Sequence, residues 1–293
     1  MTIKKTVILG LSGGVDSAVS ALLIKRQGYN VIGLFMQTFR EETANKNPCK
    51  SKSSMTDEKM AQIIAKMLKI NLISKDYKKE YYKEVIVPMI KDYQRGLTPN
   101  PDIVCNKLIK FPYLLREAKK LGADYIATGH YARIKKTKAD FQLLQGKDNT
   151  KDQSYFLHKL NQETLAKTIF PLGNLTKEEV RKVAEKHNFP NWNKPGTTGI
   201  CFLGKTANIK SFLEKKIKGE KGKILNPEGE VIGTHPGTAY FTIGQKIQEH
   251  LGLKINKPKE HAQDRYYVAE KIVNTIIAAP EGHPILKKQK ISI

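Results

Sequence analysis

Short apolar runs alternate with longer segments that carry apolar residues at helical spacing through the first 130 residues. The runs at residues 6–11, 31–36, 71–74 and 124–128 are predicted strands, because such runs are typical of buried parallel strands. Helices are expected at residues 18–27, 56–68, 81–95 and 107–121, the first of them amphipathic and closed by Gly28. This alternation predicts an α/β fold with a doubly wound parallel sheet, in which ligands bind at the carboxyl ends of the strands.

The pattern changes after about residue 204, where glycine and proline punctuate short apolar runs. This pattern of short apolar runs separated by glycine and proline favours a small, strand-rich second domain. We therefore expect three segments along the chain: a large α/β domain at residues 1–204, a small central domain at residues 205–270, and the start of a truncated C-terminal β domain at residues 271–293.

The chain has 293 residues, a net charge of +23 and 40% hydrophobic residues, enough for a folded core of one large or two ordinary domains. The basic excess indicates a polyanionic partner such as nucleic acid, but it is mostly lysine and evenly spread, so biased genome composition explains it equally well. No apolar run reaches the roughly 18 residues of a membrane span, and the N-terminal run is too short for a secretory signal. Three cysteines, an odd and sparse set, exclude a disulfide scaffold and favour a reducing, cytoplasmic setting.

A glycine-rich loop joins the first predicted strand to the first predicted helix. It consists of Gly10, Leu11, Ser12, Gly13, Gly14, Val15, Asp16 and Ser17. Two adjacent glycines let backbone N–H groups point at an anion, which the N-terminus of the following helix also attracts. The loop lacks the lysine of a Walker A motif and the spacing of a dinucleotide fingerprint. It resembles the PP-loop of ATP pyrophosphatases, which cleave ATP between the α- and β-phosphates, and Asp16 is a candidate ligand for nucleotide-bound Mg²⁺.

Cys105 and Cys201 lie in contexts that suit chemistry, whereas Cys49 lies in a polar stretch and is expected to be a surface bystander. Cys105 follows two prolines and is expected at or just before the N-terminus of a helix that begins near Lys107, a position that favours the thiolate. Cys201 lies in a glycine-flanked segment at residues 199–204, which is expected to be a strand or a mobile loop. For both cysteines the alternative interpretation is a small buried hydrophobic residue.

Six motifs occur in a fixed order along nearly the whole chain. They are the PP-loop, T-P-N-P-D-x-x-C-N at residues 98–106, A-T-G-H-Y-A-R at 127–133, K-D-Q-S-Y-F-L at 151–157, G-I-C-F at 199–202 and T-I-G-Q at 242–245. In this order they resemble the tRNA-specific 2-thiouridylase (MnmA/TrmU) family, which replaces the C2 oxygen of wobble uridine 34 by sulfur in the tRNAs for Lys, Glu and Gln. The resemblance implies an adenine nucleotide α-hydrolase-like catalytic domain at residues 1–204 and a tRNA-binding domain at residues 205–270.

The resemblance also implies chemical roles for single residues. Residues 10–17 would bind the ATP phosphates, while Met36 and Gly129 would line the adenosine site. Cys201 would carry sulfur as a persulfide received from a donor protein. Cys105 would be the nucleophile, attacking either C2 or the persulfide, and a disulfide between Cys105 and Cys201 is the expected by-product. Asp102 would act as an acid/base or orient the thiol of Cys105.

Further residues would contact the tRNA in this resemblance. The target base would meet Asn100, Pro101 and Asp102, and other parts of the tRNA would meet His130, Lys151, Asp152 and Gln153. A capping or core role is the alternative for His130, and a solvated charge is the alternative for Lys151. We expect a monomer that uses ATP and Mg²⁺ and has no contact with a membrane.

The sequence departs from the family pattern at residues 37–42, 195–198 and 246–250, and it stops at Ile293, where a C-terminal β-barrel is expected to begin. The affinity for tRNA is therefore expected to be weaker or to depend more on contacts between lysine and phosphate. Three alternatives stay open: a PP-loop ligase acting on a small metabolite, a tRNA-binding protein without catalysis, and an enzyme in which Cys105, Cys201 and Asp102 hold an iron–sulfur cluster.

Overall fold

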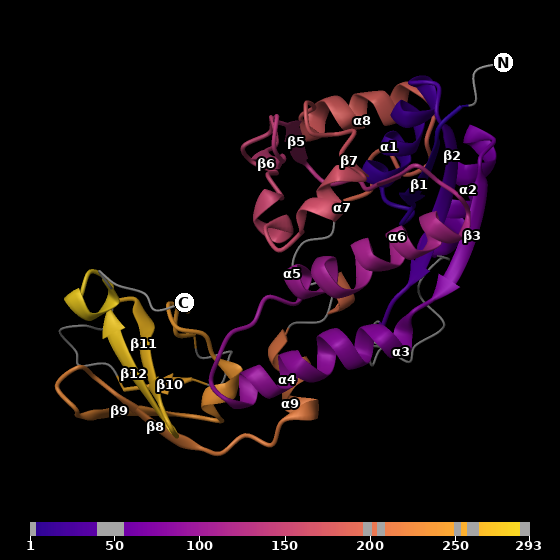
Figure 1. Ribbon diagram of the computed structural model, residues 1–293. Coiled ribbons are helices and arrows are strands. Elements are labelled where there is room, and N and C mark those ends of the chain that lie inside the picture. The colour runs from indigo at the N-terminus through magenta and orange to yellow at the C-terminus, as the bar shows by residue number, and fades with distance from the viewer. Residues whose placement is uncertain are drawn as a thin grey trace. The chain divides into compact units, whose positions relative to one another are not determined.

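A computed structural model describes residues 4–39, 56–195, 201–203, 209–248, 253–256 and 264–287. The chain forms two compact units (Figure 1), of which unit 1 comprises Met1–Ile86 and Pro101–Lys205, and unit 2 comprises Val87–Asn100 and Thr206–Ile293. The predicted surface loop around Cys49 and the side chain of Cys201 lie outside what the structure describes.

Unit 1 is built on a parallel sheet whose five strands have the order β3-β2-β1-β4-β7. The strands are β1 (Thr6–Gly10), β2 (Asn30–Gln37), β3 (Asn71–Asp76), β4 (Tyr125–Ala127) and β7 (Thr168–Ile169). The order runs outward in both directions from β1, so the carboxyl ends of β1 and β4 flank a topological switch point, where open α/β sheets bind ligands. The predicted α/β fold with a doubly wound parallel sheet is confirmed.

Helices cover both faces of this sheet and create two separate cores. Val7 and Leu9 face a core shared with helices α1 (Val15–Arg26), α2 (Asp57–Leu68) and α8 (Lys177–Lys186), whereas Ile8 faces one shared with α6 (Phe111–Lys120). The prediction of an amphipathic first helix is wrong, because α1 is packed against the sheet, α2 and α8 and buries eight of its 12 residues.

Two long helical segments contain a π-helical turn. The first has α3 (Lys78–Tyr81), the π-turn η1 (Tyr82–Ile86) and α4 (Val87–Gln94), and the second has α5 (Pro101–Cys105), the π-turn η2 (Asn106–Lys110) and α6. The expected helix start near Lys107 is therefore wrong. Helical backbone already begins at Pro101, a residue type that favours the first position of a helix.

The sequence pattern predicts no helices or strands for the rest of unit 1. It contains the hairpin of β5 (Ala132–Lys136) and β6 (Phe141–Gln145), the short helix α7 (Gln162–Ala166), and the 3₁₀ turns η3 (Ser154–Leu157) and η4 (Cys201–Leu203). Helix α8 begins with a capping box in which Thr176 and Glu179 each bind the other's backbone N–H. This cap fixes the first residue of α8, Lys177, which the site uses.

Unit 2 has a five-stranded sheet in the order β10-β9-β8-β12-β11. Its elements are α4, α9 (Ile209–Lys216), β8 (Gly222–Leu225), β9 (Val231–His235), η5 (Thr238–Tyr240), β10 (Lys254–Ile255), β11 (Tyr266–Ile272), β12 (Thr275–Pro280) and η8 (Pro284–Leu286). The prediction of a small, strand-rich second domain is confirmed. None of the helices in the described part of the chain has both the length and the apolar character needed to cross a lipid bilayer.

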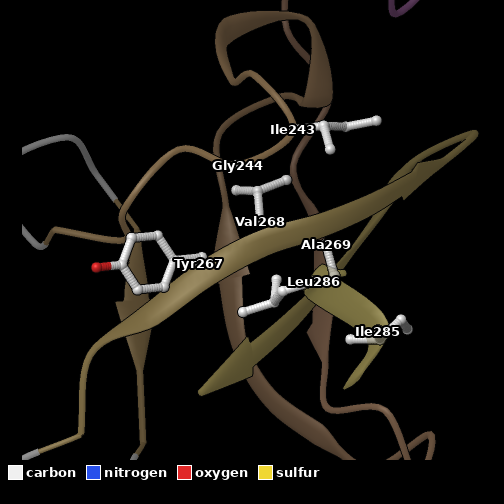
Figure 2. Close-up of a pocket in the computed structure, with 7 residues that line it drawn as sticks. All are labelled: Ile243, Gly244, Tyr267, Val268, Ala269, Ile285 and Leu286. Carbon is white, nitrogen blue, oxygen red and sulfur yellow. The ribbon is translucent and has the colours of Figure 1, made fainter. Parts of the chain in front are cut away.

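The T-I-G-Q motif forms a turn that is fastened to β11. The backbone N–H of Gly244 donates to the carbonyl of Val268 at 2.7 Å, and the N–H of Val268 donates back to Gln245 at 2.9 Å. Beside this turn lies an apolar hollow of about 280 Å³ (Figure 2), lined by Ile243, Gly244, Tyr267, Val268, Ala269, Ile285 and Leu286. The motif thus has a structural role within unit 2.

Candidate active site

The glycine-rich loop turns sharply between β1 and α1 and leaves the first N–H groups of α1 at its concave side. Gly13 has a φ of +75°, and an added Cβ there would collide with the backbone carbonyl of Asp57. The hydroxyl of Ser17 donates to the carbonyl of Gly14 at 3.0 Å and accepts from the N–H of Ser12 at 3.2 Å. Gly14 is the N-cap of α1 and provides no side-chain cap. The loop is therefore shaped to hold an anion such as a phosphate.

A cavity of about 240 Å³ opens beside this loop, at the carboxyl ends of β1, β2 and β4. Ten of the residues singled out from the sequence line it, and eight of them are Gly10, Leu11, Ser12, Asp16, Ser17, Met36, Gly129 and Gln153. Cys105 and His130 line the same cavity. Gly13 and Gly14 form the turn behind it, and Val15 is buried in the core of unit 1. The structure thus brings the phosphate loop and the first cysteine motif together.

Gly129 follows β4 and lies against the first turn of α1. A Cβ on this residue would be 2.9 Å from the backbone carbon of Asp16 and 3.0 Å from the nitrogen of Ser17. Only glycine leaves room for this approach, so Gly129 closes one wall of the cavity by backbone contact.

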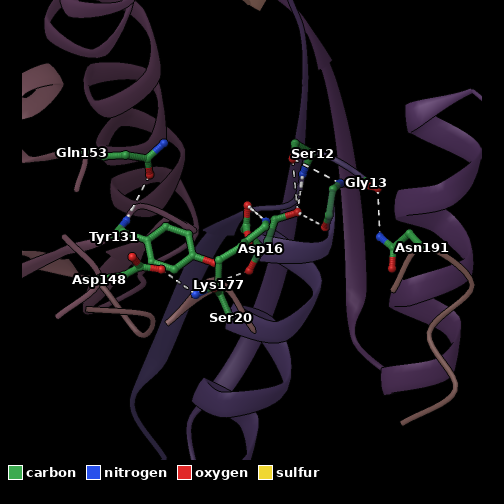
Figure 3. Close-up of polar contacts among 11 residues, drawn as sticks. Ser12, Gly13, Asp16, Ser20, Tyr131, Asp148, Gln153, Lys177 and Asn191 are labelled. Carbon is green, nitrogen blue, oxygen red and sulfur yellow. Dashed lines mark hydrogen bonds and ion pairs between the residues drawn. The ribbon is translucent and has the colours of Figure 1, made fainter. Parts of the chain in front are cut away.

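Asp16 is held by two neighbours, Tyr131 and Lys177, to which the sequence motifs assign no role (Figure 3). The ammonium of Lys177 donates to both carboxylate oxygens, at 2.6 and 2.7 Å, and the hydroxyl of Tyr131 donates to Oδ1 at 2.8 Å. Burial, followed by the charge of Asp16, raises the pKa of Tyr131, so its hydroxyl stays protonated and donates. Asp148 accepts the backbone N–H of Lys177 at 2.8 Å and fixes the lysine in place.

This network continues from Tyr131 to the K-D-Q motif. The side-chain carbonyl of Gln153 accepts the backbone N–H of Tyr131 at 3.0 Å, and the backbone N–H of Gln153 donates to the backbone carbonyl of Tyr131 at 3.0 Å. Asp152 accepts from the N–H of Gly146 and from the backbone and hydroxyl of Ser154, so it shapes the loop. Lys151 is exposed. Gln153 therefore links the cavity wall to the phosphate loop through Tyr131.

The segment after α8 is fastened to the phosphate loop from behind. The side-chain amide of Asn191, which is 1% exposed, donates to the carbonyl of Gly13 at 3.0 Å. Three residues further on, Lys194 pairs with Asp57 at 2.6 Å, and Asp57 is the residue whose carbonyl faces Gly13. These contacts hold the turn of the loop from the side opposite the cavity.

His130 is fixed between two partners at the cavity wall. Its Nδ1 lies 2.6 Å from the hydroxyl of Thr128, and its Nε2 lies 3.4 Å from the ammonium of Lys110. Its ring stacks on that of Phe111 at 5.8 Å. Burial and, secondly, the charge of Lys110 hold the pKa of His130 well below its usual value, so the imidazole is neutral. Nε2 therefore accepts from Lys110, which leaves the proton on Nδ1.

Cys105 is buried at the end of α5, five residues into the helical segment. The expectation that it lies at a helix N-terminus is wrong, because that terminus is at Pro101. Asp102 lies on the first turn of α5, and Asn100 is the last residue of its segment of unit 2. Asn106, the residue after Cys105, is 2% exposed, and its side-chain amide donates to the carbonyl of Phe156 at 3.0 Å. This bond ties the cysteine helix, which consists of α5 and η2, to η3.

The backbone of Cys201 forms the 3₁₀ turn η4, where a strand or mobile loop was expected. Its neighbour Phe202 is 2% exposed, and its ring packs 6.3 Å from that of Tyr81 and 6.1 Å from that of Phe39. Tyr81 lines the cavity that also contains Cys105. Both cysteine motifs are therefore anchored to the walls of one cavity.

The single carboxylate of Asp16 could bind a magnesium ion only together with the phosphates of a nucleotide. Asp16 provides one carboxylate, and Mg²⁺ is commonly held by one or two carboxylates together with substrate phosphates. No group of three or more His, Cys, Asp and Glu side chains that could bind a metal ion occurs among the described residues. Asp16 is the carboxylate that lines the cavity, and both of its oxygens accept from Lys177.

The parallel sheet, the anion-binding loop at its switch point and the cavity beside it define a nucleotide-binding α/β domain of the PP-loop class, with a cysteine in the nucleotide cavity. The family profile described as tRNA methyl transferase HUP domain matches residues 5–205, and the profile described as tRNA methyl transferase PRC-barrel domain matches residues 210–278. A tRNA-specific 2-thiouridylase MnmA from Nitrosomonas eutropha is 43% identical over 281 residues, which cover 96% of this chain and 75% of that protein. The MnmA 2 protein of Aliarcobacter butzleri is 44% identical over 295 residues, covering 99% and 79%.

The chain belongs to the tRNA-specific 2-thiouridylase family, which confirms the resemblance found in the sequence motifs. Among solved structures, an NMN synthetase from Francisella tularensis covers 67% of each chain at 18% identity and a TM-score of 0.41, a similarity too low to carry a functional conclusion.

Proposed function

We propose that the protein is an ATP-dependent tRNA-uridine 2-sulfurtransferase that converts wobble uridine 34 to 2-thiouridine. The observation that carries this proposal is that the phosphate loop, Met36, Gly129 and Cys105 line one cavity. A nucleotide whose phosphates occupy the loop would lie beside the cysteine that the sulfur transfer needs. The names of the relatives support the same activity.

In the first step the O2 atom of uridine attacks the α-phosphorus of ATP. The bond from that phosphorus to the bridging oxygen breaks, pyrophosphate leaves with the electron pair, and N3 of the base loses its proton to water. The N-terminus of α1 and the hydroxyls of Ser12 and Ser17 would bind the phosphates. Adenylation turns a poor leaving group into AMP and makes C2 electrophilic. When bound, Mg²⁺ at Asp16 would neutralise phosphate charge.

In the second step sulfur replaces the adenylated oxygen. The Cys105 thiolate attacks the Cys201 sulfur of a Cys201 persulfide, so a disulfide forms and hydrosulfide leaves with the electron pair of the S–S bond. The hydrosulfide adds to C2, AMP leaves with the original oxygen, and N3 is protonated again. A thiol reductant then resets the two cysteines. In the alternative order Cys105 attacks C2 first, and a covalent adduct between protein and tRNA would precede sulfur arrival.

The finer assignments extend the same proposal. Residues 100–102, His130 and residues 151–153 would contact the tRNA, and unit 2 would act as a tRNA-binding domain. The substrates would be the tRNAs for Lys, Glu and Gln, sulfur would come from a persulfide-carrying protein, and the enzyme would work as a monomer in the cytoplasm. The lysine-rich surface supports a polyanionic partner.

A reconstituted assay tests the proposal. Purified protein is mixed with unmodified tRNA for Lys, Mg–ATP and a sulfide or persulfide donor, and AMP and 2-thiouridine are measured by mass spectrometry. We expect both products, and we expect each to depend on tRNA. Cys105→Ser and Cys201→Ser should abolish 2-thiouridine, whereas Cys49→Ser, the matched control, should leave it unchanged.

Each competing function gives a different result in that assay. A ligase for a small metabolite would form no AMP in response to tRNA. A binding protein without catalysis would retain tRNA while both cysteine variants changed nothing. An enzyme with an iron–sulfur cluster would yield iron and sulfide in stoichiometric amounts after anaerobic purification. Absence of AMP with competent tRNA refutes the proposed function.

A further inference from the structure

Lys110 is a lysine of the cavity wall to which neither the motifs nor the proposed mechanism assigns a task. It is the last residue of the π-turn η2, and it lines the cavity together with Ser12, Cys105 and Gly129. It is half-buried, whereas Lys107 on the same turn is exposed. A lysine usually keeps its ammonium in water, so a lysine directed at a cavity calls for an anionic occupant.

The charge of Lys110 is not neutralised by the protein around it. Its hydrogen-bond partner is the neutral imidazole of His130, which accepts at Nε2 over 3.4 Å. Asp16 is the carboxylate that lines the same cavity, and both of its oxygens bind Lys177. In the described part of the chain no carboxylate forms an ion pair with Lys110. One N–H of the ammonium is therefore used by His130, and the others are available to a ligand.

The position of Lys110 on the cysteine helix indicates which anion it meets. Cys105 and Lys110 are five residues apart, and the hydrogen bonds of a π-helix join residues five apart, so this spacing returns to the same face of the helix. Both residues line the cavity. In the adenylated base, O2 is bonded both to C2 and to the α-phosphorus. A cysteine that acts at C2 therefore lies close to the α-phosphate. A cation on the same face therefore lies near the α-phosphate, while the phosphate loop takes the pyrophosphate.

We propose that Lys110 is a catalytic residue of the adenylation step, whose ammonium binds the non-bridging oxygens of the ATP α-phosphate. This inference rests on the proposed function. As O2 attacks and pyrophosphate leaves, negative charge spreads over those oxygens, and a fixed cation stabilises the transition state more than the bound substrate. His130 holds the ammonium in position and takes no proton from it.

The test compares Lys110→Met and Lys110→Arg with Lys107→Met, the matched control on the exposed side of the same turn. The readout is single-turnover release of pyrophosphate in the presence of tRNA, alongside the Kd for ATP, the Kd for tRNA and the melting temperature. We expect Lys110→Met to slow pyrophosphate release about 100-fold, the usual effect of removing one such donor. Both Kd values should change by less than about threefold, because ground-state binding stays with the loop. Arginine should restore at least part of the rate.

Other outcomes overturn the inference in distinguishable ways. Normal pyrophosphate release with lost 2-thiouridine would place Lys110 in the sulfur step, next to Cys105. A loss of ATP affinity as large as the loss of rate would make it a ground-state ligand. Equal slowing by Lys107→Met would show a general charge effect. If the unchanged protein releases no pyrophosphate with tRNA, the proposed function itself fails, and this inference fails with it.

Discussion

Gly13 is the residue of the phosphate loop for which the structure leaves no room for a side chain. Its φ is +75°, and a Cβ would lie 3.0 Å from the carbonyl carbon of Asp57 and closer still to the oxygen. Asp57 is the first residue of α2, so the atoms in the way belong to backbone that has little freedom to shift. Gly13→Ala therefore combines an unfavourable φ with a steric collision.

The two costs can be separated by a second glycine. Gly28 closes α1 with a φ of +90°, and nothing lies within 4 Å of an added Cβ. Gly28→Ala should lower the free energy of unfolding by about 1–2 kcal/mol, the cost of a left-handed residue. Gly13→Ala should add an overpacking cost of about 1–3 kcal/mol, giving about 2–5 kcal/mol in total. The difference between the two variants isolates the collision.

Urea denaturation of both variants measures this difference. The chain has one tryptophan, Trp192, which lies in unit 1 next to the Asn191 that holds Gly13, so its fluorescence follows the relevant unit. Gly13→Ala should also weaken ATP binding at least tenfold, while Gly28→Ala leaves it unchanged, because only the first reshapes the loop. If both variants unfold within about 0.5 kcal/mol of each other and bind ATP equally, the described packing of the loop on α2 is wrong.

Five further changes test the surroundings of the loop. Asp16→Ala should abolish adenylation and leave tRNA binding intact, and equal loss of both would refute its place at the nucleotide. Tyr131→Phe should weaken ATP binding about tenfold, since one hydrogen bond to a charged group is lost, and titration by absorbance at alkaline pH should show one fewer late-ionising tyrosine in that variant. Asn191→Ala should cost about 1–3 kcal/mol, because a buried carbonyl loses its donor; an unchanged urea midpoint contradicts this. The folded-state pKa of His130 lies below its unfolded value, so stability should fall as the pH drops below about 6.5, and His130→Gln should reduce that slope. The same pKa, followed by NMR, should rise in Lys110→Met, and a fall or no change would refute their contact.

Local sequence was sufficient to predict the parts of the site that lie within one loop. A strand, a turn with two glycines and a helix are neighbours in the chain, so their order alone placed residues 10–17 at a strand end, and the same logic placed Met36 and Gly129. The parallel sheet brings these three strand ends to one edge. Their meeting in one cavity therefore follows from topology.

The partners of those residues could not be predicted in the same way. Lys177 pairs with Asp16 across 161 positions, and Asn191 binds Gly13 across 178. No periodicity or motif joins residues so far apart, because their contact depends on how α8 packs against α1. For Lys177 the sequence does contain a local signal of a helix start. Thr176 and Glu179 have the spacing of a capping box, which indicates a helix whose first residue is Lys177.

In the cysteine helix, the hydrogen bonds of the π-turn η2 span one residue more than those of an α-helix. This difference changes which residues are expected to lie beside Cys105. In an α-helix, residues five apart point roughly 140° away from each other, so an α-helix would place Cys105 and Lys110 on different faces. The π-turn η2 brings them to the same cavity, and the helical segment begins at Pro101, four residues before Cys105. Cys105 therefore shares a cavity with Lys110 and does not lie at a helix terminus. Since π-turns are frequent at functional sites, the irregular turn is itself part of the evidence that this lysine acts in the reaction.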